Sequence, residues 1–258
     1  MEPQLRGVVV TGPVLGDMNQ VCIQFNNVHK QYGKQTVLNG IDLTIQQGEF
    51  LGLAGVNGAG KTTMIKCLLD LASVNSGSIT LAGQAHNQTG ARGVLAYLPE
   101  KFTPPYYLSG RDFLNYMAAM HGVTADPALI EQMLATLDFD IRYVDKPVRQ
   151  LSKGMSQKLG LAACFLSDRQ VYILDEPMSG LDPRARACLK HHLQTLKQQG
   201  KSLFFSTHLL SDVEAICDRV AILHEGTIRF VGTPAECCAL YQTSTFEDAY
   251  LACVRVSG

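Results

Sequence analysis

The sequence lacks a long apolar run. Its longest stretch without a charged or strongly polar residue near the centre covers residues 159–166, whereas a helix that spans a bilayer needs about 20 apolar residues. We therefore expect no membrane span. The first twenty residues contain Arg6 and Asp17 around a brief run of valines, so they lack the apolar core of a secretory signal. These absences predict a cytosolic protein.

An excess of charge of one sign is also missing. Lys plus Arg number 22 and Asp plus Glu number 23, for a formal net charge of −1, which argues against a whole-molecule electrostatic footprint for nucleic acid. Residues 183–201 are a local exception, with five basic residues and no acid: Arg184, Arg186, Lys190, Lys197 and Lys201. This pattern indicates either a nucleic-acid contact or the polar face of an amphipathic helix. The spacing of Leu189, Leu193 and Leu196 favours the helix.

Cysteine pairs of the CxxC type are absent. The eight cysteines are scattered through apolar segments and show no spacing typical of a metal site. Buried free thiols in a reducing compartment are the simplest interpretation. The chain has 258 residues, of which 46% are hydrophobic and 17% charged. This composition is that of an ordinary globular protein with one large domain or two small ones.

Strand-like and helical patterns alternate along the chain, which indicates an α/β fold. The first part differs, because short strand-like segments follow one another directly, at residues 21–25, 36–38, 41–45 and 78–81. Asn39-Gly40 and Gln47-Gly48 are typical turn sequences between such segments. We therefore expect an antiparallel sheet beside the main one.

The later part of the chain predicts a buried parallel sheet with a helical insert. Three segments are apolar throughout, as central parallel strands are, at residues 50–54, 171–174 and 203–205. Between about residues 101 and 150 the pattern becomes helical. Ser109-Gly-Arg-Asp112 predicts a capped helix start. The helical spacing then places four apolar side chains on one face of this helix: Phe113, Tyr116, Met117 and Met120.

The sharpest local signal is a complete G-x-x-x-x-G-K-[ST] motif. It reads Gly55-Val-Asn57-Gly58-Ala59-Gly60-Lys61-Thr62, with Thr63 next. The motif follows an apolar strand and precedes a helical pattern, the context that a phosphate-binding loop requires. A chance glycine-rich turn is the disfavoured alternative. Glycines let backbone N–H groups face a triphosphate at the helix N-terminus. We expect Lys61 on the β- and γ-phosphates, Thr62 on Mg²⁺ and Thr63 either on the helix surface or at the phosphate edge.

Two carboxylates follow the apolar segment 171–174, namely Asp175 and Glu176. The carboxyl edge of a parallel sheet is where such folds bind ligands. Asp175 suits a hold on Mg²⁺ through water, and Glu176 suits a base that orients an attacking water. An isolated Asp-Glu pair is more often a solvated loop, but the phosphate-binding loop upstream favours the catalytic interpretation.

A second helix start stands at Leu151-Ser152-Lys153-Gly154-Met155, before a helical pattern. Ser152 can cap this helix, and the Gly154 amide adds to a second anion-binding nest. Taken alone, the segment is better explained as an ordinary capped helix.

In order, these motifs together with Ser179-Gly-Leu-Asp182 and Ser206-Thr-His208 resemble the motif series of ATP-binding cassette (ABC) ATPases over about residues 21–233. The resemblance implies a P-loop NTPase core with a mainly parallel sheet, an antiparallel β subdomain and a helical subdomain at about residues 101–165. Lys153 and Met155 depart from the usual LSGGQ-like signature. They resemble a variant found in export-type members.

The resemblance also implies that two copies pair head to tail around two ATP molecules. The signature residues Ser152, Lys153, Gly154 and Met155 would then face the ATP of the partner. Tyr32 would stack on adenine, although it also fits an ordinary strand-end tyrosine. Asp182 would lie near the dimer interface, and His208 would reach the γ-phosphate and the attacking water.

Glu100 stands where the family usually has Gln, at the start of the helical subdomain. A carboxylate there can approach Mg²⁺ or the attacking water, but it repels phosphate when the metal is absent. We therefore expect closure of the site to depend more strongly on Mg²⁺. The aromatic pair Tyr106-Tyr107 favours a partner surface on this subdomain, where family members receive a permease.

The sequence as a whole is interpreted as an ATPase subunit that uses ATP and Mg²⁺, pairs with a second copy or a homologous subunit, and drives a separate permease on the cytoplasmic face of a membrane. Residues 1–20 are expected to form a poorly ordered extension, and residues 234–258 a short helical tail. No nucleic acid is expected as a partner. Three alternatives stay open: a non-transport ABC ATPase acting on nucleic acid or another macromolecular assembly, a P-loop kinase, and a nucleotide-gated scaffold.

Overall fold

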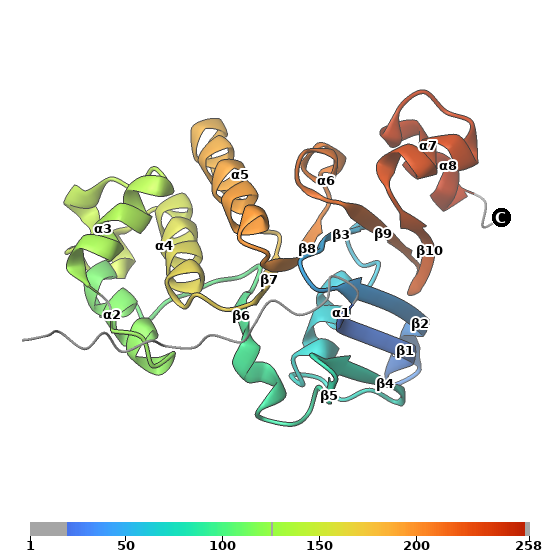
Figure 1. Cartoon of the computed structure of the whole chain (residues 1–258), viewed down its shortest axis with the longest axis horizontal. Helices are drawn as coiled ribbons and strands as arrows, with labels where there is room; N and C mark the ends of the chain where they lie inside the picture. Colours follow the sequence, from blue (N-terminus) through green and yellow to red (C-terminus); the bar gives the residue numbers. More distant parts are fainter. Residues whose placement is uncertain (1–19, 125, 256–258) are drawn as a thin grey trace, which may run out of the picture.

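The computed structural model describes residues 20–124 and 126–255, which form an α/β fold with two sheets (Figure 1). The extension expected at residues 1–20 lies, apart from Gln20, outside these ranges. Helices α2, α3 and α4 gather at one end of the molecule, and the antiparallel sheet and helices α7 and α8 lie at the other end (Figure 1).

The helices have the bounds α1 Lys61–Leu68, α2 Gly110–Met120, α3 Pro127–Thr136, α4 Lys153–Leu166, α5 Pro183–Gln198, α6 Leu210–Ile216, α7 Pro234–Tyr241 and α8 Phe246–Arg255. Short 3-10 turns lie at Ala91–Val94, Ile141–Tyr143 and Val148–Gln150.

The main sheet has six strands in the order β10-β9-β3-β8-β7-β6. Their bounds are β3 Phe50–Ala54, β6 Leu95–Leu98, β7 Val171–Asp175, β8 Ser202–Thr207, β9 Arg219–His224 and β10 Thr227–Gly232. All neighbouring pairs are parallel except β9 with β10. Every residue of β3, β7 and β8 is buried, which confirms the prediction of buried parallel strands for these segments. The carboxyl ends of five neighbouring strands, from β9 to β6, therefore meet at one edge.

The second sheet has four strands in the order β2-β1-β4-β5. Its bounds are β1 Val21–Tyr32, β2 Gln35–Gln46, β4 Ser76–Leu81 and β5 Gln84–Ala85. The expected antiparallel pairing is confirmed, but the turn predicted at Asn39-Gly40 is wrong, because both residues lie inside the single strand β2. Gly40 has a φ of 66°, so it bends the strand at an irregularity of the pairing without reversing the chain. The chain reverses at Gly33 instead, between β1 and β2.

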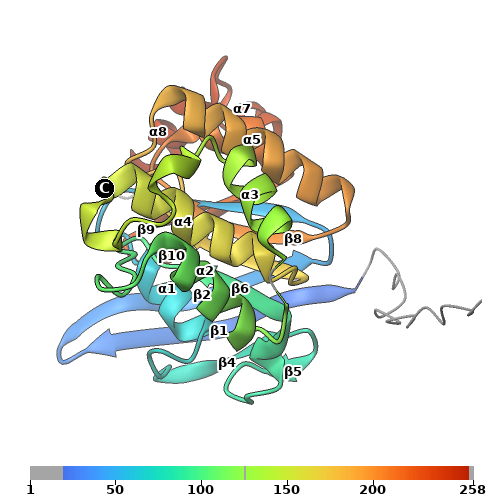
Figure 2. The ribbon, with the colours of Figure 1, turned by 90° about the vertical axis from the view of Figure 1, so that its left-hand side faces the viewer.

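Two cores lie on opposite faces of the main sheet, because successive side chains of each strand alternate between the faces. Phe50, Tyr172 and Phe205 pack with helices α2 to α5, and Leu51, Ile173 and Phe204 pack with α1 and the antiparallel sheet. Figure 2 shows α3, α4 and α5 on the side of the sheet opposite to α1. A third cluster joins the strands β9 and β3 to α7 and α8.

Helix α2 begins as predicted, because Ser109 is its N-cap and accepts a hydrogen bond from the Asp112 N–H. The predicted inward face is only partly right. Phe113 is buried, but Tyr116 and Met120 are 53% and 67% exposed. The helix instead buries Leu114 and Ala118, since the insert packs against α4 through a face rotated by about one residue from the one expected.

The basic residues of segment 183–201 belong to an amphipathic helix, as the leucine spacing predicts. Ala185, Leu189, Leu193 and Leu196 are the buried residues of α5. Four of the five basic side chains form ion pairs with acids from other segments: Arg184 with Asp138, Lys190 with Asp212, Lys197 with Asp218 and Lys201 with Asp168. This surface is therefore already compensated in charge.

Candidate functional site

The glycine-rich loop, residues 55–63, connects the buried strand β3 to helix α1. Gly58 and Gly60 have φ values of 85° and 111°, which side chains other than glycine rarely adopt. Gly60 is the N-cap residue of α1. At Gly55, a Cβ would collide with the carbonyl oxygen of Leu223. The loop therefore curls in front of the helix N-terminus, with backbone N–H groups available to an anion.

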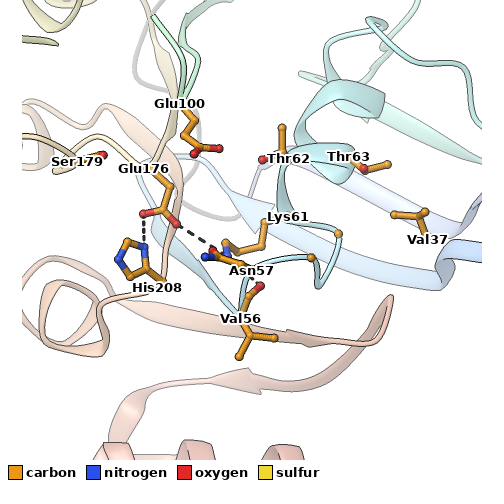
Figure 3. Close-up of a pocket in the computed structure, with 12 residues that line it drawn as sticks. Val37, Val56, Asn57, Lys61, Thr62, Thr63, Glu100, Glu176, Ser179 and His208 are labelled. Atoms are coloured by element: carbon orange, nitrogen blue, oxygen red, sulfur yellow. Dashed lines mark hydrogen bonds and ion pairs between the residues drawn. The ribbon is translucent and has the colours of Figure 1, made fainter. Parts of the chain in front are cut away.

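A cavity of about 410 Å³ lies beside this loop (Figure 3). The structure brings most of the residues predicted from the motifs to its wall: Asn57, Gly58, Gly60, Lys61, Thr62 and Thr63 from the loop and α1. Glu100, Glu176 and His208 line it from the ends of the parallel strands. Segments about 150 residues apart in sequence therefore share one cavity.

Lys61 is buried at the floor of the cavity. Its Nζ donates hydrogen bonds to the carbonyl oxygens of Gly55 at 2.6 Å and Val56 at 3.3 Å, and it lies 3.8 Å from Oε1 of Glu176. Burial lowers the pKa of Lys61, and the negative charges of Glu176, Asp175 and Glu100 oppose this effect. Because the hydrogen-bonded ammonium is held inside the loop, it is positioned for a phosphate that enters the cavity.

Asp175 ends β7 and is only 1% exposed. Its Oδ1 accepts a hydrogen bond from the Ser206 hydroxyl at the end of β8, the residue paired with Asp175 in the parallel register. Its Oδ2 has no hydrogen-bond partner. Burial raises the pKa of Asp175, and the bond from Ser206 opposes this effect. A buried carboxylate oxygen without a partner is costly, and a divalent cation is a ligand that would satisfy it.

Glu176 contacts both Lys61 and His208, which reach the cavity from different segments of the chain. Its Oε2 is 2.8 Å from Nδ1 of His208, while Oε1 faces Lys61 (Figure 3). The residue has a φ of 51°, an uncommon conformation outside glycine that is often found at functional sites. Its backbone N–H donates to the Ser206 hydroxyl at 3.0 Å. Glu176 is thus held by a cation on one side and an imidazole on the other.

The predicted signature residues lie outside this cavity. Ser152 is the N-cap of α4 and accepts a hydrogen bond from the Met155 N–H, which confirms the predicted cap. Gly154 packs so closely on Gly180 that a Cβ would come within 2.8 Å of its carbonyl oxygen. Asp182 caps α5 through the Ala185 N–H, and this bond lowers the pKa of Asp182. Gly154 and Asp182 thus adjoin the loop 179–182, and Ser179, the first residue of this loop, lines the cavity.

Some predicted residues do not reach the cavity wall, and some wall residues were not predicted. Tyr32 is 49% exposed and stacks under the Lys30 ammonium, and Ala59 is buried within the loop. Val37, Val56 and Ser179 line the cavity although none of them was predicted as a contact, and only Val37 lies outside the quoted motifs. Val37 comes from β2, and only the packing of the antiparallel sheet places it there. Its role is therefore invisible in local sequence.

These residues fit a phosphate group and a divalent cation. The curled loop offers backbone N–H groups, Lys61 offers a held ammonium, and Asp175 offers an unpartnered oxygen near the Thr62 side chain. Oxygen ligands of this kind suit Mg²⁺. Thr62 and Asp175 would hold the cation, with Glu100 facing the same space (Figure 3).

Comparisons with known proteins agree with this geometry. A family model described as ABC transporter matches residues 38–179, more than half of the chain. The chain belongs to the ABC transporter family. Within the described residues, no helix is long and apolar enough to cross a membrane.

Several relatives of this ABC protein cover most of the chain. An uncharacterized ABC transporter ATP-binding protein of Synechocystis sp. is 39% identical over 203 residues, which is 77% of this chain but 57% of that protein. The Nod factor export ATP-binding protein I of Burkholderia orbicola is 35% identical, over 84% of this chain and 72% of its own length. A solved structure described as the ATP-binding subunit of an ABC transporter is 28% identical with a TM-score of 0.82, over 90% of this chain and 99% of that one.

Proposed function

We propose that this chain is the ATP-binding and ATP-hydrolysing subunit of an ABC transporter. The observation that carries the proposal is the placement of Glu176 between Lys61 and His208, at the wall of a cavity beside a phosphate-binding loop. A carboxylate in this position can orient a water against a terminal phosphate that the loop holds. The kinase alternative does not account for the His208 contact or for the signature segment.

Each residue of the site has a defined task in this proposal. Lys61 and the loop N–H groups bind the β- and γ-phosphates, and Thr62 and Asp175 hold Mg²⁺. Bound Mg²⁺ neutralises charge that develops on the phosphates. Glu176 accepts a hydrogen bond from the attacking water and aligns it, and His208 fixes the carboxylate of Glu176 and contacts the γ-phosphate.

A second copy completes the site in this account. Ser152 and Lys153 are exposed at the N-terminus of α4 and do not line the cavity. A nucleotide would meet them only if another cassette presented them to its phosphates. We infer head-to-tail pairing around two ATP molecules, with Asp182 at the interface. The cassette would comprise residues 21–233, with a helical subdomain at about 101–165 and a tail at 234–258.

We further infer that the dimer drives a separate permease from the cytoplasmic face of a membrane, most simply as an exporter. Tyr106 and Tyr107, at 65% and 69% exposed, offer an apolar docking surface on the helical insert, and an export ATP-binding protein is among the relatives. The compensated charge of α5 disfavours nucleic acid as the partner. Purification from solubilised membranes tests this inference: an integral membrane partner should copurify, and recovery of the chain without one would contradict it.

The central experiment is the substitution Glu176→Gln, which keeps the shape of the side chain and removes its basic oxygen. We expect ATP turnover to fall by about 100-fold or more, while ATP still binds. The exposed Glu214→Gln on α6 is the control and should turn over ATP at the wild-type rate. An unchanged rate in Glu176→Gln would remove Glu176 from the catalytic role.

A further inference from the structure

Glu100 and Glu176 are the two acidic residues of the described cavity wall, and Glu100 is the one that forms no ion pair among the described residues. It follows β6, which runs parallel to β7, so it reaches the cavity from the same sheet edge as Asp175 and Glu176. Figure 3 shows its carboxylate turned into the cavity, toward Thr62. No ion-pair partner lies within 4.0 Å of it among the described residues. Glu100 is exposed, so solvent screens its charge in part, but no basic side chain of the described residues pairs with it.

The balance of charge around the cavity is negative. Glu100 and Glu176 line the cavity, and the buried carboxylate of Asp175 is close enough to act on Lys61, the sole lysine or arginine on the described part of the wall. That lysine is already engaged with Glu176 at 3.8 Å. The field of Glu100 reaches both Lys61 and Asp175, although burial remains the main influence on the pKa of each. Because the Oδ2 atom of Asp175 is also buried without a partner, the site has more negative charge than its own residues can offset.

A nucleoside triphosphate adds about four further negative charges at neutral pH, which like charges repel across several ångströms of partly screened space. A divalent cation bound with the nucleotide reverses the sign of the interaction for the carboxylates around it. In the proposed site, Asp175 holds the metal and Glu176 aligns the water. Glu100 has neither task, so a substitution of Glu100 removes one negative charge and leaves both tasks in place.

We propose that Glu100 makes nucleotide binding conditional on a divalent cation, so that the site accepts the magnesium complex of a nucleoside triphosphate and rejects the metal-free anion. The inference rests on the proposed ATP site and adds a selection rule to it. By linkage, bound nucleotide strengthens metal binding by the same factor as metal strengthens nucleotide binding.

The test is the dissociation constant of a fluorescent ATP analogue, measured with Mg²⁺ and with EDTA at equal ionic strength. In the wild-type chain, the EDTA value should far exceed the Mg²⁺ value. Glu100→Gln should reduce the ratio of the two values by about tenfold, the size expected of one charge–charge interaction in a partly screened site. Glu100→Asp keeps the charge and should keep a ratio close to that of the wild type. Glu247→Gln removes an exposed charge on α8 and should leave the ratio unchanged.

The outcomes separate the two proposals. If the analogue binds with Mg²⁺ but Glu100→Gln and the wild type have the same ratio, the role of Glu100 is overturned and the ATP site stands. A wild-type chain that binds the analogue equally well with and without Mg²⁺ also overturns it. If no variant binds the analogue even with Mg²⁺, the ATP site fails and the selection rule fails with it.

Discussion

Ser206 shows how single hydrogen bonds organise the site at the scale of residues. Its hydroxyl donates to Asp175 and accepts from the Glu176 N–H, so one side chain uses its donor and an acceptor lone pair at once. Asp175 and Glu176, the residues proposed to hold the metal and to align the water, are thereby fixed relative to each other. Since strands β7 and β8 are neighbours in register, the sheet itself enforces this arrangement.

Ser206→Ala tests this bridge. Oδ1 of Asp175 would lose its partner and leave both carboxylate oxygens without one, so we expect the free energy of unfolding to fall by about 1–3 kcal/mol, measured by urea denaturation. The affinity for the Mg²⁺ complex of the nucleotide should also weaken, because Asp175 is no longer oriented. Ser211→Ala, at an exposed position of α6, should stay within about 0.5 kcal/mol of the wild type. A Ser206→Ala variant with wild-type stability and affinity would refute the bridge.

Motifs predict residues whose chemistry is local, and they miss residues that distant segments bring in. Lys61 and Glu176 were predictable because a glycine loop and a strand end each have a recognisable sequence. The role of Ser206 as a bridge depends on which strand lies beside β7, and the place of Val37 depends on how the antiparallel sheet packs. The residues that flank Ser206 and Val37 in the sequence do not predict which strand or sheet will pack beside them.

At the scale of elements, strands were predicted better than the orientation of helices. An uninterrupted apolar segment such as β3 has few alternatives to a buried strand once a glycine loop follows it. Asn39-Gly40 resembles a hairpin turn, yet β2 continues through it because both of its halves pair with β1. Helix α2 has apolar residues on two overlapping faces, and the packing against α4 decides which face is buried.

Helix α8 is an integral part of the fold, which yields a prediction on stability. Phe246 is 2% exposed in the third core cluster, together with Val220 and Ile222. Phe246→Ala should lower the free energy of unfolding by about 3–5 kcal/mol, because it leaves a cavity in a packed core. Leu240→Ala, at a side chain 62% exposed on α7, should cost less than about 0.5 kcal/mol. Equal unfolding midpoints for the two variants would show that the tail contributes nothing to the core.

At the scale of the whole molecule, one copy contains two separate parts, each of which we infer to be one half of a shared ATP site. The cavity is lined by the glycine-rich loop and by the residues proposed to align the attacking water, while helix α4, with the proposed signature, begins outside its wall. Lys153 packs along Gly180, in the loop that runs from Ser179 on the cavity wall to Asp182 at the cap of α5. Within each copy, this loop therefore connects the cavity to the start of α4. In the proposed dimer, a nucleotide bound between the two copies would affect the structure of both.

The measurement that tests this account most directly is the solution mass of Glu176→Gln by analytical ultracentrifugation, with and without saturating ATP and Mg²⁺. Because slow hydrolysis preserves the nucleotide, the account predicts a monomer without ATP and a species of twice that mass with it. Lys61→Ala in the Glu176→Gln background should remain monomeric. If Glu176→Gln binds ATP and still sediments as a monomer at concentrations well above its ATP dissociation constant, the shared site is contradicted.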